Sequence, residues 1–220
     1  MTQRIEVYPK GPQPRRIDNI VAELVRGGLI AYPTDSGYAL GWRADNRKAA
    51  ERVVRLKRIE GEHHFTYLCR SISDVSRFAK VSNWAHRLIR RLTPGPYTFV
   101  LPATSQVPRN HKNRRPATIG IRIPEHAVVQ AILEAMDEPI LSSSLVVPEM
   151  EEEIYDTEDL YDAVHLEVDL FVDAGYCPLV FPEGRMTPGG TIEPFKKGIG
   201  LIAVETRASI VPVHLRGLDR

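Results

Sequence analysis

Four side chains that can form hydrogen bonds stand within five residues, where the apolar run 29–32 is followed by a second apolar run, 38–42. They are Thr34, Asp35, Ser36 and Tyr38. Gly37 lies among them, and glycine allows close backbone approach and positive φ angles. A polar turn between two strands is a common way to hold a small ligand on a rigid scaffold. Ordinary hairpin turns use the same residue types, so composition alone leaves both interpretations open.

The elements around this turn are predicted from the spacing of apolar residues. Run 29–32 is long enough for one buried strand, which we expect Pro33 to end. Before it, apolar residues between 17 and 25 fall at helical spacing, and Gly27-Gly28 stops that helix. After it, Asp45 or Asn46 can cap a second helix, which ends in the basic run 55–58. Strands and helices alternate further along the chain, which favours an α/β layered fold with a mixed sheet.

Length and composition predict one domain, with room for a small appendage, in a protein with a sizeable core. The 220 residues carry a net charge of +1, which gives no global argument for nucleic-acid binding. Cys69 and Cys177 form no disulfide framework, so we expect reduced thiols in a cytoplasmic protein. The first residues lack the apolar core of a signal peptide, and no run of eighteen apolar residues suggests a membrane span.

A basic surface is predicted locally. In the helix over residues 84–92, Trp84, Leu88 and Leu92 form an apolar stripe. Arginines stand opposite that stripe and again in the basic loop 109–115, and the candidates for RNA contact are Arg87, Arg90, Arg91, Arg114 and Arg115. A solvated helix face beside a charged loop explains the same charges, so this alternative stays open. His63-His64 has no further ligand nearby, and we predict no metal site.

Two further segments have residue types suited to ligand binding. Residues 93–96 (Thr-Pro-Gly-Pro) stop a helix and deliver Thr98 to a strand, although such turns are also common structural punctuation. Arg122 alternates with Ile121 and Ile123, so its side chain points to the other face of its strand. A guanidinium can bind a carboxylate or phosphate through two nitrogens, while a salt bridge at the rim is an equally good interpretation.

Residues 26–41 resemble the entry motif of the Sua5/YciO/YrdC family, K/R-G-G-hydrophobic-PTDT-x-Y-G-L-G, and Ser-Gly-Tyr-Ala-Leu-Gly at 36–41 is most similar to the YciO branch. Residues 93–101 resemble the family's WPGPLT segment, and 119–126 its VGVRxPxH segment. The resemblance implies a YrdC-like twisted mixed sheet with flanking helices and a concave basic surface over residues 1–174.

The resemblance also implies an activity. Members condense threonine, bicarbonate and ATP, with Mg²⁺, into threonylcarbamoyl-AMP for tRNA modification, releasing pyrophosphate. Lys57 and Arg122 would then be catalytic, and Pro94, Gly95 and Thr98 would contact the nucleotide. The expected substrate-binding residues are Thr34, Ser36, Tyr38, His126 and Ser144. The family is also similar to proteins that bind double-stranded RNA, so a non-catalytic module that binds tRNA or double-stranded RNA is the alternative.

Two motifs of the synthases are incomplete here. Their K-x-R motif reads Lys57-Arg58-Ile59, and adjacent helical residues diverge by about 100°. Their S-x-N motif leaves Ser144 at the serine position and Val146 at the asparagine position. Each missing contact would contribute on the order of 1–3 kcal/mol where the group is buried. We therefore expect threonylcarbamoyl-AMP synthesis to be weak or absent.

The tail, residues 175–220, follows another pattern. Residues 175–217 resemble the C-terminal half of glycerophosphate-type acyltransferases, in which Glu183, Gly184 and Arg185 would hold the glycerol phosphate. Those enzymes need an H-x4-D motif, whereas here only three residues separate His165 from Asp169. We therefore expect a non-catalytic β-α-β tail.

Overall fold

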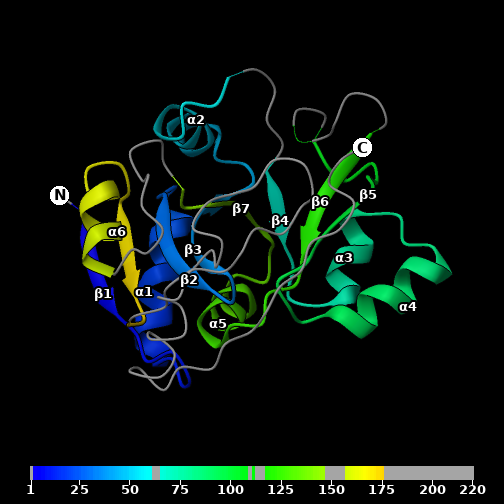
Figure 1. Ribbon diagram of the computed structural model, residues 1–220, viewed down its shortest axis with the longest axis horizontal. Coiled ribbons are helices and arrows are strands. Elements are labelled where there is room, and N and C mark those ends of the chain that lie inside the picture. Colours follow the sequence, from blue (N-terminus) through cyan, green and yellow to red (C-terminus); the bar gives the residue numbers. More distant parts are fainter. Residues whose placement is uncertain (1, 61–64, 109–110, 112–116, 147–156, 176–220) are drawn as a thin grey trace, which may run out of the picture. The chain divides into compact units, whose positions relative to one another are not determined.

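The computed structural model describes residues 2–60, 65–108, 111, 117–146 and 157–175, all of which belong to one compact unit. Within them, eight strands form one sheet in the order β1-β8-β2-β3-β7-β4-β6-β5 (Figure 1). The strands are β1 (Gln3–Glu6), β2 (Ile30–Thr34), β3 (Gly37–Arg43), β4 (Thr66–Leu68), β5 (Thr98–Pro102), β6 (Thr118–Arg122), β7 (Ile140–Ser144) and β8 (Leu170–Asp173). The helices are α1 (Pro14–Val25), α2 (Arg47–Leu56), α3 (Ile72–Phe78), α4 (Asn83–Leu92), α5 (Ala127–Met136) and α6 (Thr157–Val164).

The sheet is mixed. β2–β3, β3–β7, β4–β7 and β5–β6 pair antiparallel, whereas β1–β8, β2–β8 and β4–β6 pair parallel. The predicted α/β fold with a mixed sheet and flanking helices is therefore confirmed. None of the described helices combines the length and the apolar character that crossing a membrane requires.

Helices α1 and α5 pack against each other and cover one face of the sheet, which we call the α1/α5 face. Apolar residues at helical spacing on α1 (Ile17, Ile20 and Leu24) meet strand residues of matching parity, such as Ile30 and Leu170. These side chains are almost fully buried, and each contributes about 1.5–3 kcal/mol relative to an exposed position. This core fixes the strands whose ends carry the site.

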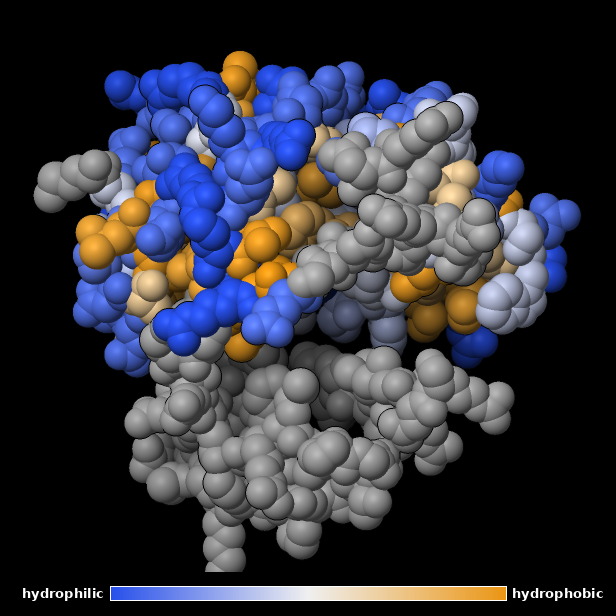
Figure 2. Space-filling model, turned by 90° about the horizontal axis from the view of Figure 1, so that it is seen from above, coloured by the Kyte–Doolittle hydropathy of each residue, from blue (hydrophilic) through white to orange (hydrophobic). Residues whose placement is uncertain are grey.

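The opposite face is covered by other helices, and Phe171 on it packs against Tyr161 of α6 with ring centroids 5.3 Å apart. Helix α2 is capped by Asn46, whose Oδ1 accepts a hydrogen bond from the Ala49 N–H at 3.1 Å, so of the two predicted caps, Asp45 and Asn46, the helix uses Asn46. At the surface, hydrophobic residues gather across the middle of the face shown in Figure 2, with hydrophilic residues around them.

Two local predictions were wrong. Pro33 does not end its strand, because β2 runs on to Thr34. Strand β8 pairs with β2 only at Ile30 and Ala31, so beyond them a proline that lacks an N–H loses no partner on that side. On α4, Trp84 is 66% exposed instead of buried, and Ala85 and Ile89 face the interior. The predicted β-α-β tail lies, after Gly175, outside the described residues.

Candidate functional site

The polar turn predicted to hold a ligand is the tip of the β2–β3 hairpin. Thr34 pairs with Gly37, which has φ +111°, and Asp35 and Ser36 form the two-residue loop. The buried Thr34 hydroxyl donates to the Gly37 carbonyl at 2.7 Å and accepts from the Ser36 N–H at 3.2 Å. Thr34 therefore shapes the turn, while Ser36 is partly exposed at its tip.

The Asp35 side chain binds two segments that are distant from the turn in sequence. Its Oδ1 forms an ion pair with Arg122 Nη2 at the end of β6, and its Oδ2 accepts from the Glu125 N–H at 2.9 Å. The side chains of Asp35 and Arg122 are only 10% and 14% exposed. The turn and Arg122, predicted from separate motifs, are therefore in contact, and the group that Arg122 meets is a carboxylate of the chain itself.

His126 lies beside this pair, directly before α5. Its Nδ1 is enclosed and has no hydrogen-bond partner among the described residues, and Arg122 Nε is in the same condition. Burial lowers the pKa of His126, and the nearby Asp35 carboxylate opposes this only in part. The imidazole is consequently neutral at pH 7 and can serve as a hydrogen-bonding group.

Lys57 follows the last residue of α2 and reaches the end of β7. Its ammonium donates to Ser143 Oγ at 2.9 Å, to the Ser144 carbonyl at 2.8 Å and to Ser144 Oγ at 3.2 Å. No carboxylate of the described residues contacts it, and burial lowers the pKa of this amine. Lys57 and Ser144, predicted from separate motifs, are therefore in direct contact.

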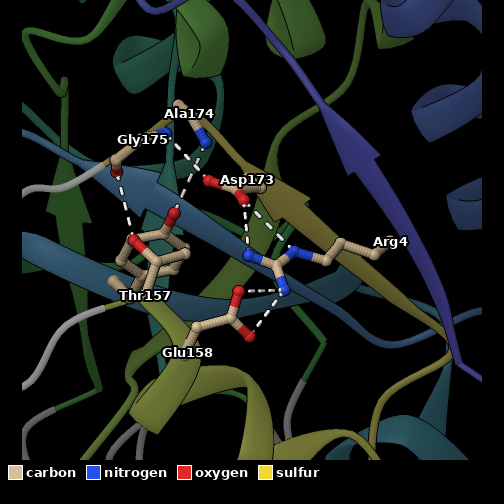
Figure 3. A network of polar contacts seen from close by, with 7 residues as sticks. Arg4, Thr157, Glu158, Asp173, Ala174 and Gly175 are labelled. Carbon is tan, nitrogen blue, oxygen red and sulfur yellow. Dashed lines mark hydrogen bonds and ion pairs between the residues drawn. The ribbon is translucent and has the colours of Figure 1, made fainter.

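Tyr38 points to the face opposite Thr34, because the two residues occupy positions of different parity in the hairpin. Its ring stacks on Phe171 with centroids 5.3 Å apart, and its hydroxyl accepts from the Ala174 N–H at 3.4 Å. Ala174 follows Asp173, which binds Arg4 in the polar network of Figure 3. Tyr38 thus lies with that network rather than with Arg122, and its predicted contact with an amino acid stays a prediction.

The segment predicted to contact a nucleotide ends beside Arg122. The Gly95 N–H donates to the Ile123 carbonyl at 2.9 Å, and a Cβ at Gly95 would lie 2.8 Å from the Leu92 carbonyl oxygen, so the turn requires glycine. Pro94 is exposed. Thr98, also exposed, pairs with Arg122 across β5 and β6 and therefore shares its face of the sheet. Nucleotide contact by these residues stays a prediction.

Sequence reasoning missed a buried pair beneath the hairpin. The Tyr32 ring lies over Gly41, where an added Cβ would come within 2.6 Å of Tyr32 Cε1. Its hydroxyl reaches Ser142 Oγ of β7 at 2.7 Å. Burial raises the pKa of Tyr32, so the phenol stays protonated. Both residues lie in conspicuous sequence runs, Tyr-Pro-Thr and Ser-Ser-Ser. The two partners are 110 positions apart, however, and no local pattern indicates that they meet.

The arginines predicted to bind RNA are exposed where the structure describes them. Arg87, Arg90 and Arg91 all lie on the surface of α4, a helix without acidic residues. None of the three has an acidic partner among the described residues. Arg114 and Arg115 lie outside those residues. Within the same part of the chain, no three His, Cys, Asp or Glu side chains come together as metal ligands do.

Known proteins resemble both the sequence and the fold. The Sua5/YciO/YrdC family model, described as "Telomere recombination", matches residues 22–182. YciO of Escherichia coli is 42% identical over 176 residues, which are 80% of this chain and 85% of that protein. Its crystal structure aligns with a TM-score of 0.75 over the same shares of both chains.

More distant relatives have names that state an activity. A threonylcarbamoyl-AMP synthase of Halorhodospira halophila is 31% identical over 138 residues, 62% of this chain and 71% of that protein. Pyrococcus abyssi Sua5, crystallised with L-threonine, shares the fold with a TM-score of 0.70 at 24% identity, covering 80% of this chain and 51% of that one.

The comparisons do not support the acyltransferase resemblance of residues 175–217. The family model continues to residue 182, beyond the point near Gly175 where we expected the match to end. From its match over residues 22–182 and the likeness to YciO, the chain belongs to the Sua5/YciO/YrdC family.

Proposed function

We propose that this protein is a slow threonylcarbamoyl-AMP synthase. The amine of threonine attacks the carbon of bicarbonate and water leaves, which gives a carbamate. A carbamate oxygen then attacks the α-phosphorus of ATP, the bond between the α- and β-phosphates breaks, and pyrophosphate departs. Mg²⁺ would enter on the nucleotide and neutralise the leaving charge. The relatives named as threonylcarbamoyl-AMP synthases support this reaction class.

The Lys57 ammonium is the observation that carries the proposal. Serine oxygens alone hold it among the described residues, so its charge has no acidic partner there. A partly buried ammonium without a counter-charge favours an anionic ligand, such as the threonine carboxylate or a phosphate. Arg122, paired with Asp35, offers its remaining terminal nitrogen, and Thr98 offers an exposed hydroxyl on the same face of the sheet as Arg122.

The low rate follows from the two incomplete motifs. Arg58 directly follows Lys57 with φ +48°, so its backbone has left the helical conformation. Val146, at the asparagine position, is 51% exposed and has no side-chain amide. In this proposal catalysis depends mainly on positioning by Lys57, Ser144 and Arg122.

The test is the release of pyrophosphate from ATP. We expect release that requires both threonine and bicarbonate. Arg122→Ala should abolish it, and Lys57→Met should lower kcat by about 100-fold or more. Arg15→Ala, at an exposed position of α1, is the control and should retain the wild-type rate. No pyrophosphate above the level without threonine would refute the proposal.

The second candidate is a module that binds double-stranded RNA or tRNA, and one observation favours it. Trp84, 66% exposed, stands on α4 with three exposed arginines that have no acidic partner among the described residues. Arginines bind phosphates and an exposed indole can stack on a base.

This candidate predicts binding that weakens steeply with salt. Replacing Arg87 and Arg91 by Ala should lower the slope of log K against log salt by about two units for a duplex, with Arg15→Ala again as the control. Binding of RNA at low salt without release of pyrophosphate would favour the binding module over the enzyme. An unchanged salt slope in the double variant would exclude α4 as its contact surface.

A further inference from the structure

The three kinds of nitrogen in the Arg122 guanidinium are used differently. Nη2 is taken by Asp35, and Nε is enclosed without an acceptor. Nη1 makes no hydrogen bond to the described residues and is not among the enclosed atoms. A ligand arriving from solvent therefore meets Nη1 first. The expectation that Arg122 grips an anion through two free nitrogens does not fit this geometry, because the second terminal nitrogen is already bonded.

The charge around Arg122 is balanced within the protein. Asp35 supplies one negative charge in a pair whose side chains are 10% and 14% exposed. His126, which lies close enough to Asp35 to feel its charge, has a pKa lowered by burial and is neutral at pH 7. Tyr32 also lies near Arg122 and Asp35, and burial raises its pKa, so it carries no charge either. Glu125 meets Asp35 through its backbone N–H. The pair thus has no net charge, and its attraction for a free anion is weaker than that of an unpaired arginine.

We propose that Asp35 is a positioning residue of the site. It holds the Arg122 guanidinium with Nη1 toward the ligand, and its negative charge cancels the positive charge that would otherwise attract free anions. Both carboxylate oxygens are used, one on β6 and one at the start of α5. A rigid tether of this kind reduces the reorganisation that the guanidinium needs when its substrate arrives. Because the pair is neutral, Arg122 selects its ligand by fit at Nη1 and adds little to the binding of free inorganic phosphate or pyrophosphate. The turnover part of this inference rests on the proposed function, whereas the anion-binding part does not.

The first test uses Asp35→Asn, which keeps the shape and removes the charge. We expect this variant to bind pyrophosphate about tenfold more tightly than the wild type in calorimetry, with a steeper salt dependence. Threonine-dependent turnover should fall about tenfold or more in kcat without a rise in KM for ATP. A residue with a purely structural role would not strengthen anion binding. Equal or weaker pyrophosphate binding by Asp35→Asn would overturn the proposal.

Asp45→Asn is the matched control, because Asp45 also binds an arginine, Arg43, at 2.9 Å, but is 68% exposed. It should change neither pyrophosphate affinity nor kcat. Asp35→Glu separates charge from position: pyrophosphate affinity should stay at the wild-type value while kcat falls. Full turnover in Asp35→Glu would refute positioning. If no variant, the wild type included, releases pyrophosphate from ATP, the proposed function fails and the calorimetric comparison still decides the role of Asp35.

Discussion

Arg4 and Arg122 both pair with aspartates at the ends of strands, and they differ in how fully their nitrogens are used. Arg4 gives Nε and Nη2 to Asp173, at 3.1 and 2.8 Å, and Nη1 to Glu158 at 2.8 Å, as Figure 3 shows. Its guanidinium also lies over the Tyr161 ring, 5.1 Å from the centroid. Arg122 has one bonded nitrogen, one enclosed without an acceptor and one open.

The difference separates a structural arginine from one suited to a ligand. The Arg4 network joins β1, β8 and α6 and gives every guanidinium nitrogen a carboxylate partner, so nothing in it calls for a further ligand. Arg122 is also held by a carboxylate, yet it keeps donors that the chain does not satisfy. An unused donor beside a neutral histidine is costly unless something binds there. The comparison therefore places the candidate site at Arg122 and treats Arg4 as part of the scaffold.

The largest expected effect is on the scaffold side. Asp173→Ala removes the acceptor of two Arg4 nitrogens and of the Gly175 N–H, and leaves a partly buried guanidinium short of partners. We expect a loss of about 3 kcal/mol in the free energy of unfolding, measured by urea denaturation. Glu158→Gln, whose side chain is 65% exposed, should cost under about 1 kcal/mol. Equal losses in both variants would contradict the ranking of the two partners.

A somewhat smaller effect tests the scaffold beneath the site. Gly41→Ala places a Cβ 2.6 Å from Tyr32 Cε1, so the ring must shift and its bond to Ser142 weakens. We expect a loss of about 2 kcal/mol in urea denaturation. Gly11→Ala is the control, because nothing lies within 4 Å of its added Cβ. It should leave stability unchanged or raise it slightly, and a matching loss in Gly11→Ala would refute packing as the cause.

Local rules predicted the elements well because their causes are local. The Asn46 cap, the stop at Gly27-Gly28 and the alternation around Arg122 depend on neighbours a few residues away. The end of the strand at Pro33 and the exposure of Trp84 were mispredicted because both depend on which other elements pack beside these residues. A single sequence does not contain that information in its periodicity.

The residues of the site were predicted from the sequence, but the contacts between their side chains were not. Thr34 and Arg122 were predicted from separate motifs, but Asp35, the group that links the turn to the strand, was missed. The 87 residues between Asp35 and Arg122 hide the contact from any pattern of spacing. The contact of Lys57 with Ser143 and Ser144 likewise exists only once α2 and β7 have folded together.

The pH dependence of the free energy of unfolding should reflect the Arg122 region, because His126 lies beside the pair of Arg122 and Asp35. Burial lowers the pKa of His126 below its ordinary 6.5, so below that pH the unfolded chain takes up a proton before the folded protein does. The unfolded state is then favoured, and the free energy of unfolding falls as the pH drops from about 6.5. His111, whose pKa burial also lowers, contributes a separate share. His126→Asn should reduce this decline in urea denaturation series at several pH values, and an unchanged decline would refute the assignment to His126.

The smallest expected effect tests whether stability and the site can vary separately. Asp137 caps the far end of α5 with φ +51°, a conformation that costs an ordinary residue more than glycine. Asp137→Gly removes that cost and loses a surface ion pair with Arg70 from a side chain that is 81% exposed. We expect a net gain of about 0.5 kcal/mol in urea denaturation. Asp18→Gly, inside α1, should instead lose a few tenths of a kcal/mol, since a helix interior disfavours glycine. If α5 serves the site only through its first residues, pyrophosphate affinity should be the same in both variants, and a change in Asp137→Gly alone would show that the helix transmits strain to Arg122.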